Sequence, residues 1–305
     1  MAGSPFFSIT IPAYNRAYIL EETISSIQAQ TFTDWEVIVV DDGSTDNTKD
    51  VVETIGDRRV RYIYQHNAER SVARNNGADH AKGTYLLFLD SDDKYAPEHL
   101  DKLADFLKSK GTPVAMAFTS VCYLTENGLE KPEIPVMKDE GAFDYLLLQP
   151  ITPSRVCIHR DIFKTFRFDP KIVIVEDLVL WVCIASEFPV YHLPEFTLYY
   201  RIHGGNSIDL SRDSYTSRLK GLFRLFNDKD YSAVSSLIPQ AIKQHLLAEC
   251  YFNIARHFEY IKNYKKMNRE LWRSFSHKSG YRNKERLYMF LTHFRLTAGL
   301  LRKKL

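Results

Sequence analysis

The chain has 305 residues, of which 45% are hydrophobic and 26% charged, and its formal net charge is +2 at pH 7. This composition excludes a disordered or fibrous protein and predicts one large globular domain, or one domain with an appendage. No segment reaches the roughly eighteen uninterrupted apolar residues of a membrane-spanning helix, and the N-terminus lacks the pattern of a signal peptide. The four cysteines lie far apart without a CxxC pair, so neither a zinc site nor a disulfide framework is expected.

Strand-like and helix-like segments alternate over about the first 120 residues, as in βα units. The apolar run EVIVV is typical of a strand buried in a parallel sheet. Apolar residues at helical spacing predict helices between the strands. Strands are expected at 6–12, 36–40, 60–64, 84–89 and 113–124, and helices at 18–30, around Val51 and Ile55, at 69–81 and at 97–111.

This alternation predicts a mostly parallel sheet with helices on both faces. In such sheets, ligands bind beyond the carboxyl ends of the strands. Acidic residues stand at these ends: Asp41 and Asp42 follow the second strand, and Asp90, Asp92 and Asp93 follow the fourth. We therefore expect both clusters at the same edge of the sheet.

The chain changes character after about residue 120. Several prolines divide residues 120–210 into short pieces, among which 176–188 is predicted to be a helix and 190–207 strand segments that end in a glycine loop. From residue 212 onward Gly and Pro are rare, and basic and aromatic residues recur at helical spacing. The expected domains are therefore residues 1–210 and a helical region, residues 211–305.

The stretch LFLDSDD runs a hydrophobic strand into three acids. Asp-x-Asp after a strand can hold a divalent cation such as Mg²⁺ or Mn²⁺, which usually shares such a site with substrate phosphates. The alternative is that Asp92 or Asp93 caps the helix that begins near Pro97. Neither a GxxxxGK[ST] loop nor a GxGxxG fingerprint is present, so a bound nucleotide would be held by another scheme.

Five motifs occur in an order that resembles family 2 glycosyltransferases: ITIPAYNR, VVDDGSTDNT, ARNNGADHAKGTYLLFLDSDD, VEDLVLWV and YRIHGGNS. The resemblance covers about residues 5–210. It implies an α/β, Rossmann-like GT-A nucleotide-diphospho-sugar transferase fold, here with a C-terminal helical extension. It also implies an inverting, metal-dependent hexosyltransferase that uses a nucleotide-sugar donor, commonly UDP-linked, and a glycan or polyprenyl-linked acceptor of the bacterial surface-polysaccharide type, with no nucleic-acid partner.

The resemblance assigns a nucleotide pocket to positions in these motifs. Tyr14 would stack on the base and Asp42 would hydrogen-bond to it, while Asp90 would lie near the ribose or the metal. Arginines after the third strand could contact the diphosphate. The full nucleotide-binding set is Pro12, Ala13, Tyr14, Asn15, Asp42, Arg70, Arg74, Asp90 and Ser91.

The resemblance also assigns the metal and the base. Asp92, with Asp90 and His203, would hold Mn²⁺ or Mg²⁺ on the diphosphate, where the cation neutralises the charge of the leaving group. Asp177 would take the proton of the acceptor hydroxyl, with Glu176 as the fallback. One direct displacement inverts the anomeric carbon, and only one base is required.

Other interpretations stay open at this point. The acids at 176 and 177 could be first-turn residues favoured by the helix dipole, Tyr14 could be a packing residue, and His203 an ordinary loop residue. The protein could be an inactive nucleotide-sugar-binding protein, although the metal and base acids occur together. It could be a nucleotidyltransferase, but IPAYNRAYIL lacks the glycine expected there. The donor sugar is not identified by the sequence.

The C-terminal segment predicts an amphipathic helix. Such a basic helix can lie on an anionic bilayer, here through residues 282–305, or it can pack on the protein's own helices. A lipid-linked acceptor favours the first, with the protein cytoplasmic and peripheral at the inner face of the cell membrane. The apolar stripe is Leu287, Phe290, Leu291, Phe294, Ala298 and Leu301, and the basic residues are Arg282, Lys284, Arg286, Arg295, Arg302, Lys303 and Lys304.

Overall fold

The computed structural model describes residues 3–138, 141–203, 214–277 and 279–291. The chain divides into two compact units, Met1–His203 and Gly204–Leu305, and each is described by itself. The boundary expected near residue 210 lies outside the described residues.

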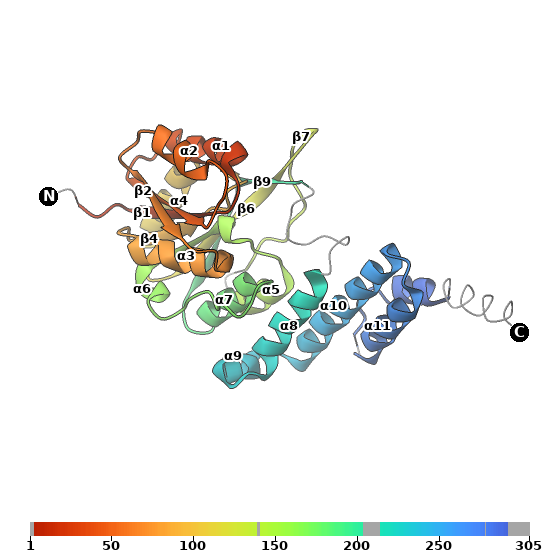
Figure 1. Cartoon of the computed structure of the whole chain (residues 1–305). Helices are drawn as coiled ribbons and strands as arrows, with labels where there is room; N and C mark the ends of the chain where they lie inside the picture. Colours follow the sequence, from red (N-terminus) through yellow and green to blue (C-terminus); the bar gives the residue numbers. More distant parts are fainter. Residues whose placement is uncertain (1–2, 139–140, 204–213, 278, 292–305) are drawn as a thin grey trace, which may run out of the picture. The chain divides into compact units, whose positions relative to one another are not determined.

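The N-terminal half of the first unit is built from βα units, as the sequence predicts (Figure 1). Its four strands are parallel and lie in the order β3-β2-β1-β4. All eight residues of β2 are buried, which agrees with its continuous apolar run. The strands are β1 (Phe7–Ala13), β2 (Trp35–Asp42), β3 (Val60–Gln65) and β4 (Tyr85–Phe88), and the helices are α1 (Ala17–Gln28), α2 (Thr48–Thr54), α3 (Glu69–His80) and α4 (His99–Ser109).

The sheet continues from β4 with strands of mixed direction, in the order β8-β6-β9-β5. β8 is antiparallel to both of its neighbours, β4 and β6, whereas β6 and β9 are parallel. A short strand, β7, forms a hairpin with β6. The elements are β5 (Lys94–Tyr95), β6 (Met116–Thr125), β7 (Gly128–Glu130), α5 (Ala142–Leu148), η2 (Pro153–Arg155), β8 (Val156–His159), α6 (Arg160–Phe163), α7 (Glu176–Ala185) and β9 (Val190–Arg201).

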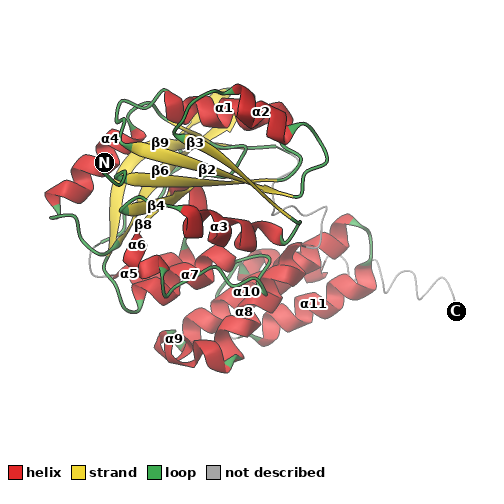
Figure 2. Cartoon of the chain, turned by 60° about the vertical axis from the view of Figure 1, so that its left-hand side comes forward, coloured by secondary structure: helices red, strands yellow, loops and turns green. Residues whose placement is uncertain are grey.

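Helices cover both faces of this sheet, as expected from the βα alternation (Figure 2). α1 and α4 pack their apolar sides on one face, where they share a core with β1, β2 and β4. α3 lies on the other face and approaches β1 closely, because a Cβ atom on Gly77 would come within 2.2 Å of the Thr10 side chain. Only glycine allows this approach, which fixes the C-terminal half of α3 against β1.

The second unit is helical in its described part, as the spacing after residue 212 predicts. Long side chains of α10 and α11 form its core, around Phe252, Met267 and Leu271. No described helix is long and apolar enough to cross a membrane. The helices are α8 (Ser214–Asn227), η3 (Lys229–Tyr231), α9 (Ser232–Leu237), α10 (Gln240–Tyr260) and α11 (Tyr264–Ser276), and residues 283–291 are also helical.

One residue of the predicted basic surface is placed differently. Arg286 is 1% exposed and donates hydrogen bonds to Ser274 and to the carbonyl oxygen of Ser279, so it holds the helices together and adds no surface charge. Leu287 and Leu291 of the predicted apolar stripe are about half exposed, whereas Phe290 of the same stripe packs against the core formed by α10 and α11. The remaining residues of the stripe and of the basic set, beyond residue 291, lie outside the described residues.

Candidate active site

The acidic clusters lie at one edge of the sheet, as predicted. β1 and β2 are parallel and in register, with Ala13 opposite Asp41, and β4 runs beside β1 in the same direction. The carboxyl ends of these three strands therefore meet at the same edge.

The loop after β1 has a defined shape. Asn15 has φ 52°, in the left-handed region that asparagine tolerates better than most residues. Its backbone N–H donates to Ser44 Oγ at 2.9 Å, and its side-chain oxygen accepts from the Thr45 N–H at 2.8 Å. Tyr14 is 49% exposed, so it is not a core residue. Pro12 and Ala13, the last residues of β1, stand directly before it.

The acids after β2 are both buried but differ in their contacts. Asp41 accepts hydrogen bonds from the Ser44 N–H at 2.8 Å and from the Tyr62 hydroxyl at 2.6 Å, so both of its oxygens shape the loop. Asp42 accepts two bonds through Oδ1 alone, from Gln65 and from the Ala68 N–H. Its Oδ2 accepts no hydrogen bond from the described residues, so it could accept one from a ligand.

The acids after β4 have different surroundings. Asp93 is 1% exposed and accepts from Ser154 Oγ at 2.7 Å and from the Arg201 N–H at 3.1 Å. Burial, and then the nearby charges of Asp90 and Asp92, raise the pKa of Asp93 well above its usual value. Neither Asp92 nor Asp93 caps α4, because the N-cap residue there is Glu98, and the Leu100 N–H in the first turn donates to Gln30 Oε1 at 2.9 Å.

Asp90 and Ser91, in the same loop, are held by residues of neighbouring elements. Asp90 donates its N–H to Ser154 Oγ at 3.1 Å, and its side chain accepts from Arg74 at 2.7 Å. Ser91 is buried and its carbonyl oxygen accepts from the Thr23 hydroxyl. The loop is therefore fixed by side chains from α1, α3 and η2.

The Asp92 carboxylate lies beside the imidazole of His203, with Oδ2 and Nε2 3.0 Å apart. Two ligands in adjacent positions of an octahedral ion, each at about 2.1 Å, would also stand about 3 Å apart. Among the described residues no group of three His, Cys, Asp or Glu side chains could hold a metal by itself. Asp92 and His203 thus fit a metal that takes its remaining ligands from a diphosphate and water.

The two acids at the start of α7 point to different surroundings. Glu176 is 5% exposed, and its Oε1 is 3.0 Å from Arg74 Nη1 and 3.9 Å from Arg70 Nε. Asp177 is partly exposed, and its Oδ1 accepts the Leu178 N–H. Val175, directly before them, has the left-handed angles φ 70° and ψ 19°.

Sequence reasoning missed the residues that hold these loops. Ser154 bridges the Asp90 backbone and the Asp93 side chain. Arg201 binds the Asp92 carbonyl oxygen and Glu22 in α1, and Arg16 lies 3.9 Å from Asp92 Oδ2. Arg201 stands inside the YRIHGG motif and Arg16 inside ITIPAYNR, so both could have been found there. Ser154 stands in no recognised pattern, and only the fold brings it to the loop.

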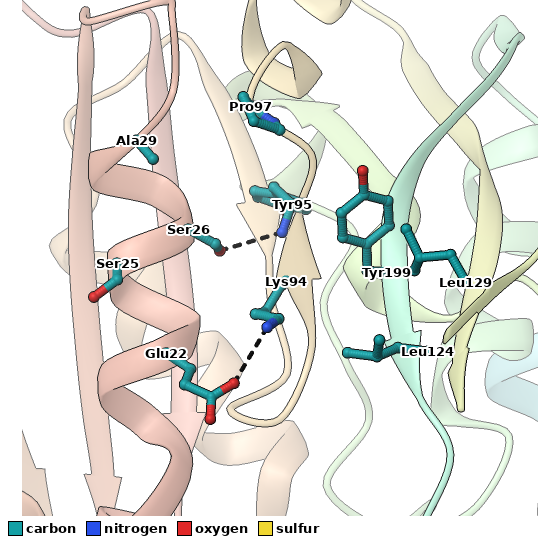
Figure 3. Close-up of a pocket in the computed structure, with 10 residues that line it drawn as sticks. All are labelled: Glu22, Ser25, Ser26, Ala29, Lys94, Tyr95, Pro97, Leu124, Leu129 and Tyr199. Carbon is teal, nitrogen blue, oxygen red and sulfur yellow. Dashed lines mark hydrogen bonds and ion pairs between the residues drawn. The ribbon is translucent and has the colours of Figure 1, made fainter. Parts of the chain in front are cut away.

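A hollow of about 500 Å³ lies between α1, β5 and the strands β6, β7 and β9 (Figure 3). Leu124, Leu129 and Tyr199 give it an apolar wall, and Lys94 donates to Glu22 at 3.2 Å at one end. None of the predicted site residues lines it. The candidate active site is therefore the strand-end cluster and not this hollow.

Comparisons with known proteins agree on the family of relatives. A family model described as glycosyl transferase family 2 matches residues 8–167. The chain is 30% identical over 203 residues to the putative teichuronic acid biosynthesis glycosyltransferase TuaG of Bacillus subtilis, covering 65% of this chain and 79% of the relative. It is 28% identical over 292 residues to a GalNAc(5)-diNAcBac-PP-undecaprenol beta-1,3-glucosyltransferase of Campylobacter jejuni, covering 89% of each.

Solved structures with the same fold include two with bound donors. S. aureus TarS 1-349 in complex with UDP-GlcNAc has a TM-score of 0.60 at 20% identity, over 87% of this chain and 79% of that one. The mannosyltransferase PcManGT from Pyrobaculum calidifontis, in complex with GDP-Man and Mn²⁺, has a TM-score of 0.56 at 19% identity, over 97% and 81%. At these identities the likeness shows a common fold alone.

Proposed function

Because the chain belongs to glycosyl transferase family 2, with the GT-A fold and a nucleotide-sugar donor, we propose an inverting, metal-dependent transfer with Asp177 as the base. The sugar moves from a nucleotide diphosphate, UDP in the first instance, to a hydroxyl group of a glycan or lipid-linked acceptor. Family membership argues against the nucleotidyltransferase alternative, and the joint presence of Asp92 and Asp177 argues against an inactive binding protein.

The observation that carries this proposal is the division of roles at the start of α7. Glu176 is buried in an ion pair with Arg74, so it is not available to an acceptor. Asp177, the next residue, is partly exposed, and Arg74 joins Glu176 to Asp90 after β4. A carboxylate in that position can take the hydroxyl proton while the acceptor oxygen attacks the anomeric carbon.

The donor side of the proposal uses the edge formed by β1, β2 and β4. Tyr14 offers an exposed ring for stacking on the base, between Ala13 and Asn15, and Asp42 offers Oδ2 to a base N–H. Pro12, Ser91 and Asp90 complete the wall of this pocket, and Arg70 can contribute positive charge toward the diphosphate.

Asp92 and His203 are the residues that would hold Mn²⁺ or Mg²⁺. The cation would supply positive charge to the leaving diphosphate.

Thermal-shift measurements with nucleotides test this proposal directly. UDP, GDP and dTDP sugars are compared with and without Mn²⁺, because a ligand that binds only the folded state raises the melting temperature. We expect a UDP sugar to give the largest shift, and only in the presence of Mn²⁺. No shift from any of these donors, or equal shifts without metal, would contradict the donor and metal assignment.

The exposed leucines of the second unit support contact with an anionic membrane as a second proposal. Leu287 and Leu291 lie four positions apart on the helix at 283–291, near the exposed Arg282 and Lys284. A lipid-linked acceptor would require such access.

Flotation with anionic liposomes at low salt should be reduced by the double change Leu287→Ser and Leu291→Ser. The matched control is Leu129→Ser, at a leucine that is equally exposed in the first unit, and a wild-type chain that does not float would overturn the proposal.

A further inference from the structure

The Arg74 side chain joins two parts of the active site that are distant in the sequence. Its Nη2 lies 2.7 Å from Asp90 Oδ1 at the end of β4, and its Nη1 lies 3.0 Å from Glu176 Oε1 at the start of α7. The arginine is 1% exposed. One buried guanidinium therefore links the donor side of the site to the helix that carries the proposed base.

Arg74 itself is held on a rigid support. α3 is fixed on β1 at Gly77, where the backbone approach leaves no room for a side chain. Asn75, which follows Arg74 in α3, donates to the Phe168 carbonyl oxygen at 2.8 Å and accepts from the Phe168 N–H at 3.2 Å. The guanidinium centre lies 5.2 Å from the centre of the Phe168 ring. α3 thus also holds the segment that leads into α7.

The backbone before Glu176 is in a conformation that needs such support. Val175 has φ 70°, in the left-handed region that a β-branched residue adopts only under strain. This turn separates the two acids that follow, so that Glu176 is buried and Asp177 is partly exposed. The pairing of Glu176 with Arg74 is a contact that can hold the turn in place.

The charge of Arg74 is secure in this position. Burial acts to lower the pKa of Arg74, but the carboxylates of Asp90 and Glu176 outweigh it and raise that pKa above its usual value. The arginine therefore stays protonated, and its single positive charge offsets part of the negative charge of two acids that would otherwise repel each other and the phosphates of a donor.

We propose that Arg74 is a positioning residue that fixes the Asp90 loop and the start of α7 relative to each other, so that donor binding orders the base. It acts through Asp90 and Glu176 and not by direct contact with a phosphate, because reaching a ligand would break one of two buried ion pairs. This rests on the proposed role of Asp177 as base, and it assigns Glu176 a holding role in the same site.

Hydrogen exchange with and without nucleotide tests this coupling. The probes are UDP, GDP and dTDP, each with Mn²⁺, on the full chain. In the wild type, the nucleotide that binds should slow amide exchange at residues 89–93 and also at 175–178. Glu176→Gln keeps the shape of the side chain but removes the charge that pairs with Arg74. We expect its Kd for the nucleotide to stay within about twofold of the wild-type value and residues 89–93 to remain protected. The nucleotide-induced protection at 175–178 should fall by at least about tenfold.

Arg74→Lys should lose the nucleotide-induced protection at both loops, residues 89–93 and 175–178. A single ammonium does not replace a planar guanidinium that binds two carboxylates. Its nucleotide affinity should fall by about tenfold. Arg61→Lys is the matched control, because Arg61 pairs with Glu36 at 2.8 Å near the N-terminal ends of β2 and β3, whereas the candidate site lies at the carboxyl ends of the strands. It should leave exchange at both loops unchanged.

The proposal is overturned if nucleotide protects the amides of residues 175–178 in Glu176→Gln as strongly as in the wild type. This outcome can be read even if Arg74→Lys fails to fold. The proposal would also be overturned if Arg74→Lys and Arg61→Lys lost nucleotide-induced protection at the two loops to the same extent, because this would indicate a general effect on stability. Failure of the base assignment would be seen separately, as normal transfer by Asp177→Asn, and would leave the exchange pattern unchanged.

Discussion

The acidic pairs Asp92–Asp93 and Glu176–Asp177 show the same contrast in burial. In each pair one acid is buried and bound by neighbouring side chains, Asp93 by Ser154 and Glu176 by Arg74. The other acid of each pair is partly exposed at the edge of the sheet. Neighbouring acids in a motif therefore differ in burial and in contacts, and in the proposed function the buried acid holds the loop while the exposed acid meets the ligand.

The order of roles is reversed between the two pairs. After β4 the exposed acid comes first, whereas at α7 the buried acid comes first. Position within a motif therefore does not decide which acid is exposed, and the direction of the backbone at each site does. Val175, with its left-handed φ of 70°, supplies that direction at α7.

The largest expected effect is at the exposed acid of the second pair. Asp177→Asn should lower kcat for sugar transfer by about 10³-fold, because general-base catalysis contributes about 10²–10⁴-fold. Nucleotide affinity, measured by calorimetry with UDP and Mn²⁺, should stay the same, since the base acts on the acceptor. Normal turnover by this variant would break the comparison and return the base role to Glu176.

A smaller effect is expected after β2, where the comparison extends to Asp41 and Asp42. Asp42→Asn should weaken UDP binding by about tenfold, because a hydrogen bond to a charged group contributes about 1.5–3 kcal/mol. Asp41→Asn is the control, since Asp41 binds Ser44 and Tyr62 within the loop. It should lower the melting temperature more than Asp42→Asn does, and the reverse pattern would show that the two roles are exchanged.

Buried titratable groups elsewhere in the first unit should affect stability without affecting chemistry. Burial lowers the pKa of His99 to about 3, whereas its ordinary value is 6.5. Below pH 6.5 the unfolded chain binds a proton that the folded chain refuses, so stability is lost as the pH falls from about 6.5 toward 3. At pH 5 this loss is on the order of 2 kcal/mol.

His99→Phe keeps an aromatic ring against Tyr95 and removes the titratable nitrogens. Its free energy of unfolding, measured by urea titration between pH 7 and 5, should fall less steeply than that of the wild type, with kcat at pH 7 unchanged. An identical slope in the two proteins would show that His99 does not carry this pH dependence.

The sequence predicted the parallel half of the sheet, its helices and the edge where the acids meet, because these features follow from local periodicity and from strand direction. It did not predict the antiparallel β8, which is short and follows a proline-rich stretch. It named Asp92, His203, Glu176 and Asp177 from motifs, and the structure brings the first two within 3.0 Å. The Ser154 bridge and the Arg74 ion pairs depend on contacts between distant segments, which periodicity does not encode.

The measurement that tests the central claim most directly compares Asp92→Asn with Ser154→Ala. Asp92→Asn should abolish the Mn²⁺-dependent part of UDP binding, about 10- to 100-fold in Kd, at an unchanged or higher melting temperature. Ser154→Ala removes the Ser154 hydroxyl that accepts from the Asp90 N–H and donates to Asp93 Oδ2, so it should destabilise the fold by about 1–3 kcal/mol and weaken binding much less. The account would be contradicted if Asp92→Asn lowered the melting temperature and kept the wild-type affinity for UDP and Mn²⁺.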